Sequence, residues 1–300
     1  MENKLSFKKI TLQGISLLLY LNALNIFVMF LALYFSAFFV FSSSNFLLHN
    51  FRDLRLHGLI FSSLTSVAAG YIINHFYDEE RDELGKPILN YFKEFVSQQS
   101  YLYLYLLLNL LSLCVAFVLS WKIGVFYIAY QFLIWFYSHK ISRWIFAKNI
   151  FKVILVLFPF LALIIHYQII NKKILLFAAL LFLLLLIKEI LKDVKNYISD
   201  SIFKYQSIPN TFGLQKTGIF LASIQSISLL ISLYLSNYQK IGDMIWYFRI
   251  SNFLFIFGII ISFFPKRYLW IALGWMYKVW IFLGVLAIVL IDWKDLPLQR

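Results

Sequence analysis

Five carboxylates fall within six positions of a chain that is otherwise strongly apolar. They belong to the segment DEERDE, residues 78–83. Asn74, Asp78 and Asp82 follow one another at intervals of four, and side chains at that interval stack on one face of a helix. The sequence therefore predicts a polar stripe of one amide and two carboxylates at the end of an apolar helix, with the remaining acids of the segment in solvent.

A second polar group follows a later apolar run, in the segment KEILKDVKNYISD. Asp193, Asn196 and Asp200 are spaced by three and then four residues, which again places them on one helix face. Glu189 lies one turn before them. We expect this stripe, like the first, to end a membrane span on the cytoplasmic side.

Oxygen ligands presented by two helices are typical of a site for a hard cation. Mg²⁺ prefers a few carboxylates together with water and phosphate oxygens. The two stripes therefore predict a diphosphate held through Mg²⁺, and nearby cations would neutralise the rest of its charge. The predicted metal ligands are Asn74, Asp78, Asp82, Asp193, Asn196 and Asp200, and the predicted diphosphate-binding residues are Lys86, Lys140, Arg143 and Lys204. The alternative is that the acids are simply solvated at helix ends.

Composition places these stripes in a membrane protein. The 300 residues are 62% hydrophobic and 14% charged, with a mean hydropathy of +0.79, whereas soluble domains have about 25% charged residues. The net charge of +13 does not indicate nucleic-acid binding, because the basic residues mostly flank apolar runs and anchor them. The single cysteine, Cys114, excludes an intrachain disulfide and a cysteine-based metal site.

About nine segments are apolar over a length that could span the hydrocarbon core, which takes about 20 helical residues. The sequence thus predicts an all-α, polytopic membrane protein, a bundle of transmembrane helices with a cytoplasm-facing polar cavity and one domain over residues 1–300. The first segment shows no cleavage site and is predicted to be retained. The segments are 12–41, 56–76, 101–120, 122–138, 150–169, 173–191, 217–236, 243–264 and 268–291.

Basic residues predict the orientation. With these nine spans, 17 of the 27 Lys and Arg residues lie on the side of the N-terminus and nine lie on the other side. Because cytoplasmic loops are enriched in Lys and Arg, the N-terminus is expected in the cytoplasm. A bacterial inner membrane is the expected location.

Three motifs resemble the UbiA family of intramembrane prenyltransferases. The first, Asn74, Asp78 and Asp82 followed by ELGKP, resembles the family's N-x-x-x-D-x-x-x-D element after the second span. The segment 193–200 resembles its D-x-x-D-x-x-x-D element, although Asn196 replaces the middle acid. The loop YSHKISRWIFAKN resembles the family's Tyr-Ser segment with basic residues. The family's first span carries Arg-Pro-x-Asn, of which NALN retains Asn25 and lacks the Arg.

This resemblance implies transfer of a polyprenyl group from its diphosphate to a membrane-associated acceptor, with Mg²⁺ as cofactor. The implied catalytic residues are Asp78, Asp82 and Asp200. Tyr137 would lie beside the allylic cation through its ring face, or would be an interfacial anchor, and Ser138 and Asn25 complete the implied prenyl pocket. The acceptor would be a glycerol-phosphate lipid or an aromatic precursor of quinones or haem. KEILKD resembles the geranylgeranylglycerol-phosphate geranylgeranyltransferase-like branch more closely.

Other functions stay open. Asn196 and the missing Arg favour a weakened or non-catalytic family member that binds isoprenoid lipid. A transporter would place its polar residues near the bilayer midplane, whereas the acids here crowd one interface. A CDP-alcohol phosphotransferase would carry a Gly-Ala-Arg signature, which this sequence lacks.

Overall fold

The structure is a computed structural model that describes residues 2–41, 47–79, 90–92, 95–203, 205–237 and 239–291. Helices account for most of these residues, and no strand occurs among them. The predicted all-α class is therefore confirmed. The physical reason is that a helix satisfies its backbone N–H and C=O groups internally, which the hydrocarbon core of a membrane demands.

Within the described residues, eight helical segments are long and apolar enough to cross a membrane. The predicted fourth span, 122–138, also forms a helix, α8 (Trp121–His139), but its hydropathy is too low to place it among these eight. Its 19 residues would extend about 28 Å, close to the thickness of a bilayer core. The eight segments are Ala23–Val40, Leu54–Tyr77, Gln98–Leu119, Ala147–Tyr167, Lys172–Lys195, Ile208–Ser236, Ile241–Ser262 and Arg267–Leu290.

The predicted first span, 12–41, is wrong in its extent. The helix α1 (Glu2–Tyr20) ends before α2 (Ala23–Phe35) begins. Between them Asn22 adopts a φ of 54°, a left-handed conformation that interrupts a helix and that Asn tolerates better than most residues. Only α2, continued by the π-helical turn η1 (Ser36–Val40), has the length and hydropathy of a span.

The chain divides into two compact units. Unit 1 comprises Met1–Phe30 and Leu54–Ser142, and unit 2 comprises Leu31–Asp53 and Arg143–Arg300. Each unit is described by itself below. The expectation of one domain over 1–300 stays a prediction, because a division by packing does not show whether either unit folds alone.

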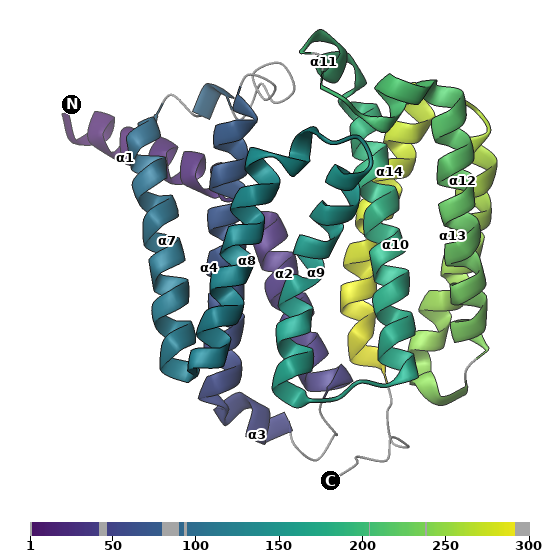
Figure 1. Cartoon of the computed structure of the whole chain (residues 1–300), viewed down its shortest axis with the longest axis horizontal. Helices are drawn as coiled ribbons and strands as arrows, with labels where there is room; N and C mark the ends of the chain where they lie inside the picture. Colours follow the sequence, from purple (N-terminus) through teal and green to yellow (C-terminus); the bar gives the residue numbers. More distant parts are fainter. Residues whose placement is uncertain are drawn as a thin grey trace. The chain divides into compact units, whose positions relative to one another are not determined.

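In unit 1, α4 (Leu54–Tyr77) packs against α7 (Gln98–Leu119) and α8, and the three helices lie side by side in Figure 1. Hydroxyl groups join them. Ser63 Oγ lies 2.6 Å from Tyr127 Oη, and Ser66 Oγ lies 2.8 Å from Ser112 Oγ. Small serine side chains let the helices approach closely, and hydrogen bonds hold apolar helices together where lipid removes the hydrophobic driving force.

In unit 2, α10 (Lys172–Lys195) is the central helix and packs against α9 (Ala147–Tyr167), α12 (Ile208–Ser236) and α14 (Arg267–Ala287). α12 also packs along α13 (Ile245–Ser262), as Figure 1 shows. The side chain of Asn171 accepts the Ile174 N–H at 2.8 Å and caps the start of α10. α12 begins earlier than the predicted span 217–236 and breaks at Gly213, whose φ of 76° is readily adopted only by glycine. Two shorter helices are α3 (Leu47–Arg52) and α11 (Tyr197–Ile202). The short helical turns are η3 (Ile141–Arg143), η4 (Gln239–Met244) and η5 (Ile288–Leu290).

Candidate functional site

The first motif lies where α4 ends in unit 1. Asn74 occupies the last turn of α4, and Asp78 follows one turn later. The Asn74 amide donates a hydrogen bond to Asp78 Oδ2 at 3.1 Å, and the Asp78 backbone N–H donates to the Asn74 carbonyl at 3.0 Å. The structure thus brings together two of the three residues of the predicted stripe. Asp82 and Lys86 lie outside the described residues.

The end of α8 lies beside the end of α4. The rings of Tyr77 and His139 meet edge to face with their centroids 5.5 Å apart, and His139 also stacks on Trp135 at 5.3 Å. Lys140, which directly follows α8, is exposed. Unit 1 therefore carries a carboxylate, an amide and a lysine at the same end of two neighbouring helices.

The remaining predicted residues of unit 1 are buried or half-buried. Tyr137 and Ser138 are buried on the last turn of α8. The Ser138 hydroxyl donates to the Ile134 carbonyl at 3.1 Å, within its own helix. Asn25 is half-buried on the first turn of α2, where its backbone N–H donates to the Asn22 carbonyl at 2.9 Å. The Ser138 hydroxyl is thus hydrogen-bonded within its own helix. The prenyl pocket that the sequence predicts is not tested by these contacts and stays a prediction.

The second motif, in unit 2, does not continue along one uninterrupted helix. α10 ends at Lys195, Asn196 has the non-helical angles φ −88° and ψ 6°, and α11 then begins. Asp193 therefore belongs to α10 and Asp200 to α11. Asp200 is completely buried, whereas Asn196 is half-buried. Arg143, also in this unit, is exposed in η3, and Lys204 lies outside the described residues.

Asp193 has two polar partners on α9 that the sequence interpretation missed. Its Oδ2 atom lies 3.1 Å from the ammonium of Lys148 and accepts a hydrogen bond from the Asn149 amide at 3.0 Å. The side chains of Lys148 and Asp193 are only 7% and 8% exposed. The predicted metal ligand is thus a partner in a buried ion pair.

Glu189 forms a second ion pair one turn earlier on α10. Its two carboxylate oxygens lie 2.9 Å from Lys152 Nζ and 3.3 Å from Lys188 Nζ. Lys152 is four residues after Lys148 on α9, as Glu189 is four residues before Asp193 on α10. A sequence signal for both pairs existed: two lysines and two acids at helical spacing on consecutive, antiparallel helices.

The oxygen donors in each unit suit a hard divalent cation. Among the described residues no three His, Cys, Asp or Glu side chains gather in a way that could hold a metal ion. In unit 1 Asn74 and Asp78 offer adjacent amide and carboxylate oxygens, which fit Mg²⁺ as part of a shell completed by water and phosphate. In unit 2 the second motif contributes the carboxylates of Asp193 and Asp200, and that of Asp193 is bound by a lysine and an amide.

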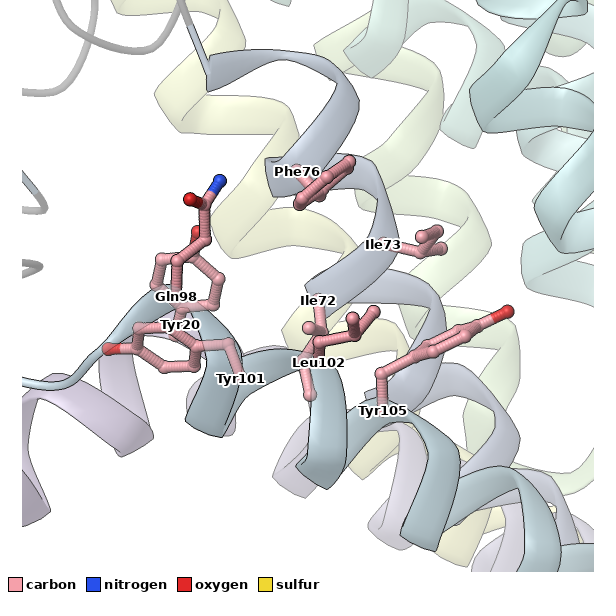
Figure 2. A pocket seen from close by; sticks show the side chains of 8 residues that line it. All are labelled: Tyr20, Ile72, Ile73, Phe76, Gln98, Tyr101, Leu102 and Tyr105. Carbon is pink, nitrogen blue, oxygen red and sulfur yellow. The ribbon is translucent and has the colours of Figure 1, made fainter.

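A pocket in unit 1 is lined by aromatic and apolar side chains and one amide, and none of its lining residues is acidic. Figure 2 shows its lining side chains, which come from α1, α4 and α7. Tyr20 stacks on Tyr101 at 3.8 Å between ring centroids and also contacts His75 at 4.9 Å. The pocket does not test the predicted cytoplasm-facing polar cavity, which stays a prediction. Its lining is Tyr20, Ile72, Ile73, Phe76, Gln98, Tyr101, Leu102 and Tyr105.

Comparison with known proteins identifies one matching family. The model of the UbiA prenyltransferase family matches residues 49–295, which include both motifs and the loop between them. A search of curated proteins finds no match.

Solved structures of similar fold cover nearly the whole chain. A structure described in work on digeranylgeranylglyceryl phosphate synthase in membranes has a TM-score of 0.66 and 16% identity, and the alignment covers 94% of this chain and 99% of that one. A UbiA homologue from Archaeoglobus fulgidus, bound to GPP and Mg²⁺, has a TM-score of 0.62 and 16% identity over 91% and 99% of the two chains. A homologue from Aeropyrum pernix K1 has a TM-score of 0.56 and 12% identity over 86% and 97%. At such low identity the likeness concerns the fold alone.

Proposed function

Because this chain belongs to the UbiA prenyltransferase family, we propose that it transfers a polyprenyl group from its diphosphate to a membrane-associated acceptor. The chain is a multi-pass membrane prenyltransferase of the UbiA type. The single observation that supports diphosphate binding through a metal ion is the hydrogen bond between Asn74 and Asp78 at the end of α4. An amide held against a carboxylate at a helix end provides oriented oxygen ligands without a buried, uncompensated charge.

Magnesium is the proposed cofactor, and a relative of this fold binds GPP with Mg²⁺. The residues proposed to hold it are Asn74, Asp78 and Asp82 of the first motif and Asp200 of the second. When bound, Mg²⁺ would supply positive charge that stabilises the departing diphosphate. Cationic side chains would neutralise the remaining phosphate charge, and the proposed ones are Lys86, Lys140, Arg143 and Lys204.

The protein's own side chains would stabilise the allylic cation and hold the prenyl chain. Tyr137, buried on the last turn of α8, is proposed to face the allylic cation, because a ring face attracts positive charge. Burial of a prenyl chain among apolar helices contributes about 0.8 kcal/mol per methylene. This gain favours a donor whose tail lies among the spans while its headgroup meets the polar helix ends.

For the acceptor, we propose a glycerol-phosphate lipid. Two observations support it: the resemblance of KEILKD to that branch, and the fold shared with a digeranylgeranylglyceryl phosphate synthase. An aromatic acceptor is the alternative. We also propose that the N-terminus lies in the cytoplasm, with the acidic motifs, and that the membrane is a bacterial inner membrane, on the strength of the Lys and Arg distribution.

The test is magnesium-dependent release of diphosphate from GPP and longer prenyl diphosphates by the purified protein. Product identification by mass spectrometry, with glycerol-phosphate and aromatic acceptors offered in parallel, would then distinguish the acceptors. The variants Asp78→Asn and Asp82→Asn should lose turnover. The absence of diphosphate release at every chain length and with every acceptor would instead favour a non-catalytic isoprenoid-binding protein, to which the neutral Asn196 in the second motif already lends some support.

A further inference from the structure

We propose that the ammonium of Lys148 occupies the place of a divalent cation at Asp193, so that the second motif contributes no metal ligand through Asp193. This inference rests on the proposed function, since it concerns how the proposed metal site is built. It makes Lys148 a positioning residue that sets how many divalent ions the chain binds.

The first support is the geometry around the carboxylate. Lys148 Nζ and the Asn149 amide both contact the same oxygen, Asp193 Oδ2, at 3.1 and 3.0 Å. Asn149 is 4% exposed and Lys148 is 6% exposed. A metal ion bound through this oxygen would have to displace a buried ammonium and an amide, both of which would then lose their partner.

The second support is that the pair belongs to a regular arrangement. Lys148 and Lys152 lie one turn apart on α9 and face Asp193 and Glu189, which lie one turn apart on α10. Because the helices are antiparallel, the first lysine pairs with the second acid and the second lysine with the first. Because two ion pairs form with the same spacing, the contact follows from how α9 and α10 pack and does not depend on the rotamer of one side chain. Along this face the lysines of α9 neutralise the carboxylates of α10.

The third support is the charge of the motif. Asn196 is neutral, and Lys148 compensates the charge of Asp193. Asp200 is therefore the one carboxylate of this motif that we assign to the metal. A single carboxylate with water can help to hold an ion that phosphate also binds, but it is a poor site for a second independent ion. The neutral Asn196 and the lysine paired with Asp193 both reduce the number of charged ligands that this motif can provide to a metal ion.

The experiment counts bound metal directly. Mn²⁺ is titrated into the purified protein in detergent with inorganic pyrophosphate present, and free Mn²⁺ is followed by electron paramagnetic resonance. Asp193→Asn should retain the wild-type stoichiometry with an affinity within about twofold, whereas Asp200→Asn should lose affinity by about tenfold or more. Lys148→Met should free the carboxylate and tighten or add Mn²⁺ binding. The matched control is Lys152→Met, which breaks the neighbouring pair and should leave Mn²⁺ binding unchanged.

The outcomes separate this inference from the proposed function. Loss of Mn²⁺ binding in Asp193→Asn equal to that in Asp200→Asn would overturn the inference and leave the proposed function standing. Mn²⁺ binding that is unaffected by Asp78→Asn would overturn the proposed metal site itself. Should Asp193→Asn fold poorly, the double variant Lys148→Met with Asp193→Asn removes both buried charges. It should bind Mn²⁺ as the wild type does, and weaker binding would refute the inference.

Discussion

Neutralising Asp193 alone should destabilise the protein strongly, and neutralising its partner Lys148 as well should restore most of the loss. The two groups are 3.1 Å apart and nearly buried. Coulomb's law with an effective dielectric constant of about 20 gives about 5 kcal/mol at this separation. Removing one member of a buried pair typically costs about 3–5 kcal/mol, because the other charge stays buried without compensation, whereas replacing both is often nearly neutral.

The assay is a double-mutant cycle of wild type, Asp193→Asn, Lys148→Met and the double variant, with apparent melting temperatures measured in one detergent. A loss of 3–5 kcal/mol corresponds to a decrease of about 5–8 °C for a chain of this length. Each single variant should fall in that range, and the double variant should lie within a few degrees of the wild type. Such a result would show strong coupling between the two positions.

Additive effects would refute the reasoning. If the double variant melted at the temperature expected from the sum of the single losses, the two groups would not interact as the structure has them. A decrease below about 2 °C in Asp193→Asn would likewise show that Lys148 finds water or another partner. Lys152→Met provides a comparison, since Lys152 is 26% exposed and its pair with Glu189 should therefore contribute less.

Three further predictions follow from individual positions. Asp78→Asn should lower turnover by at least about a hundredfold while expression persists, as measured by diphosphate release; near-normal turnover would remove the metal assignment. Asn196→Asp should raise the apparent affinity for Mg²⁺ by adding a charged ligand, and an unchanged Mg²⁺ titration would show that this position is not a ligand. Gly258→Ala should lower stability by about 1–3 kcal/mol, because its Cβ would meet the side-chain oxygen of Gln225. Gly14→Ala is the control, because the added carbon would meet nothing within 4 Å beyond its own stretch of helix, and equal melting temperatures for the two variants would contradict the prediction.

The elements that carry the candidate site were largely predictable. Long apolar runs in this chain have no stable alternative to a helix in lipid, so their existence and approximate ends follow from composition. The pairing of Asn74 with Asp78 followed from helical spacing in the same way. The break at Asn22 was missed, because hydropathy over residues 12–41 does not register a single left-handed residue.

The partners of the second motif were not predictable at the same level. Spacing along α10 indicated that Asp193 lies on a polar face, but the identity of the group opposite depends on how α9 rotates and slides against α10. That register placed Lys148 and Asn149 against the carboxylate. As a result, Asp193, which the sequence predicts to be a metal ligand, has the buried ammonium of Lys148 as its partner.

By itself the sequence determined that the chain is a helical membrane protein, which residues form its two acidic motifs, and which family it resembles. These properties depend on composition and on spacing within single helices, where 3.6 residues per turn decides which side chains share a face. Only the tertiary structure decided which charges compensate one another. That choice depends on helix packing over distances of a few ångströms, and within unit 2 it placed the ammonium of Lys148 against the carboxylate of Asp193.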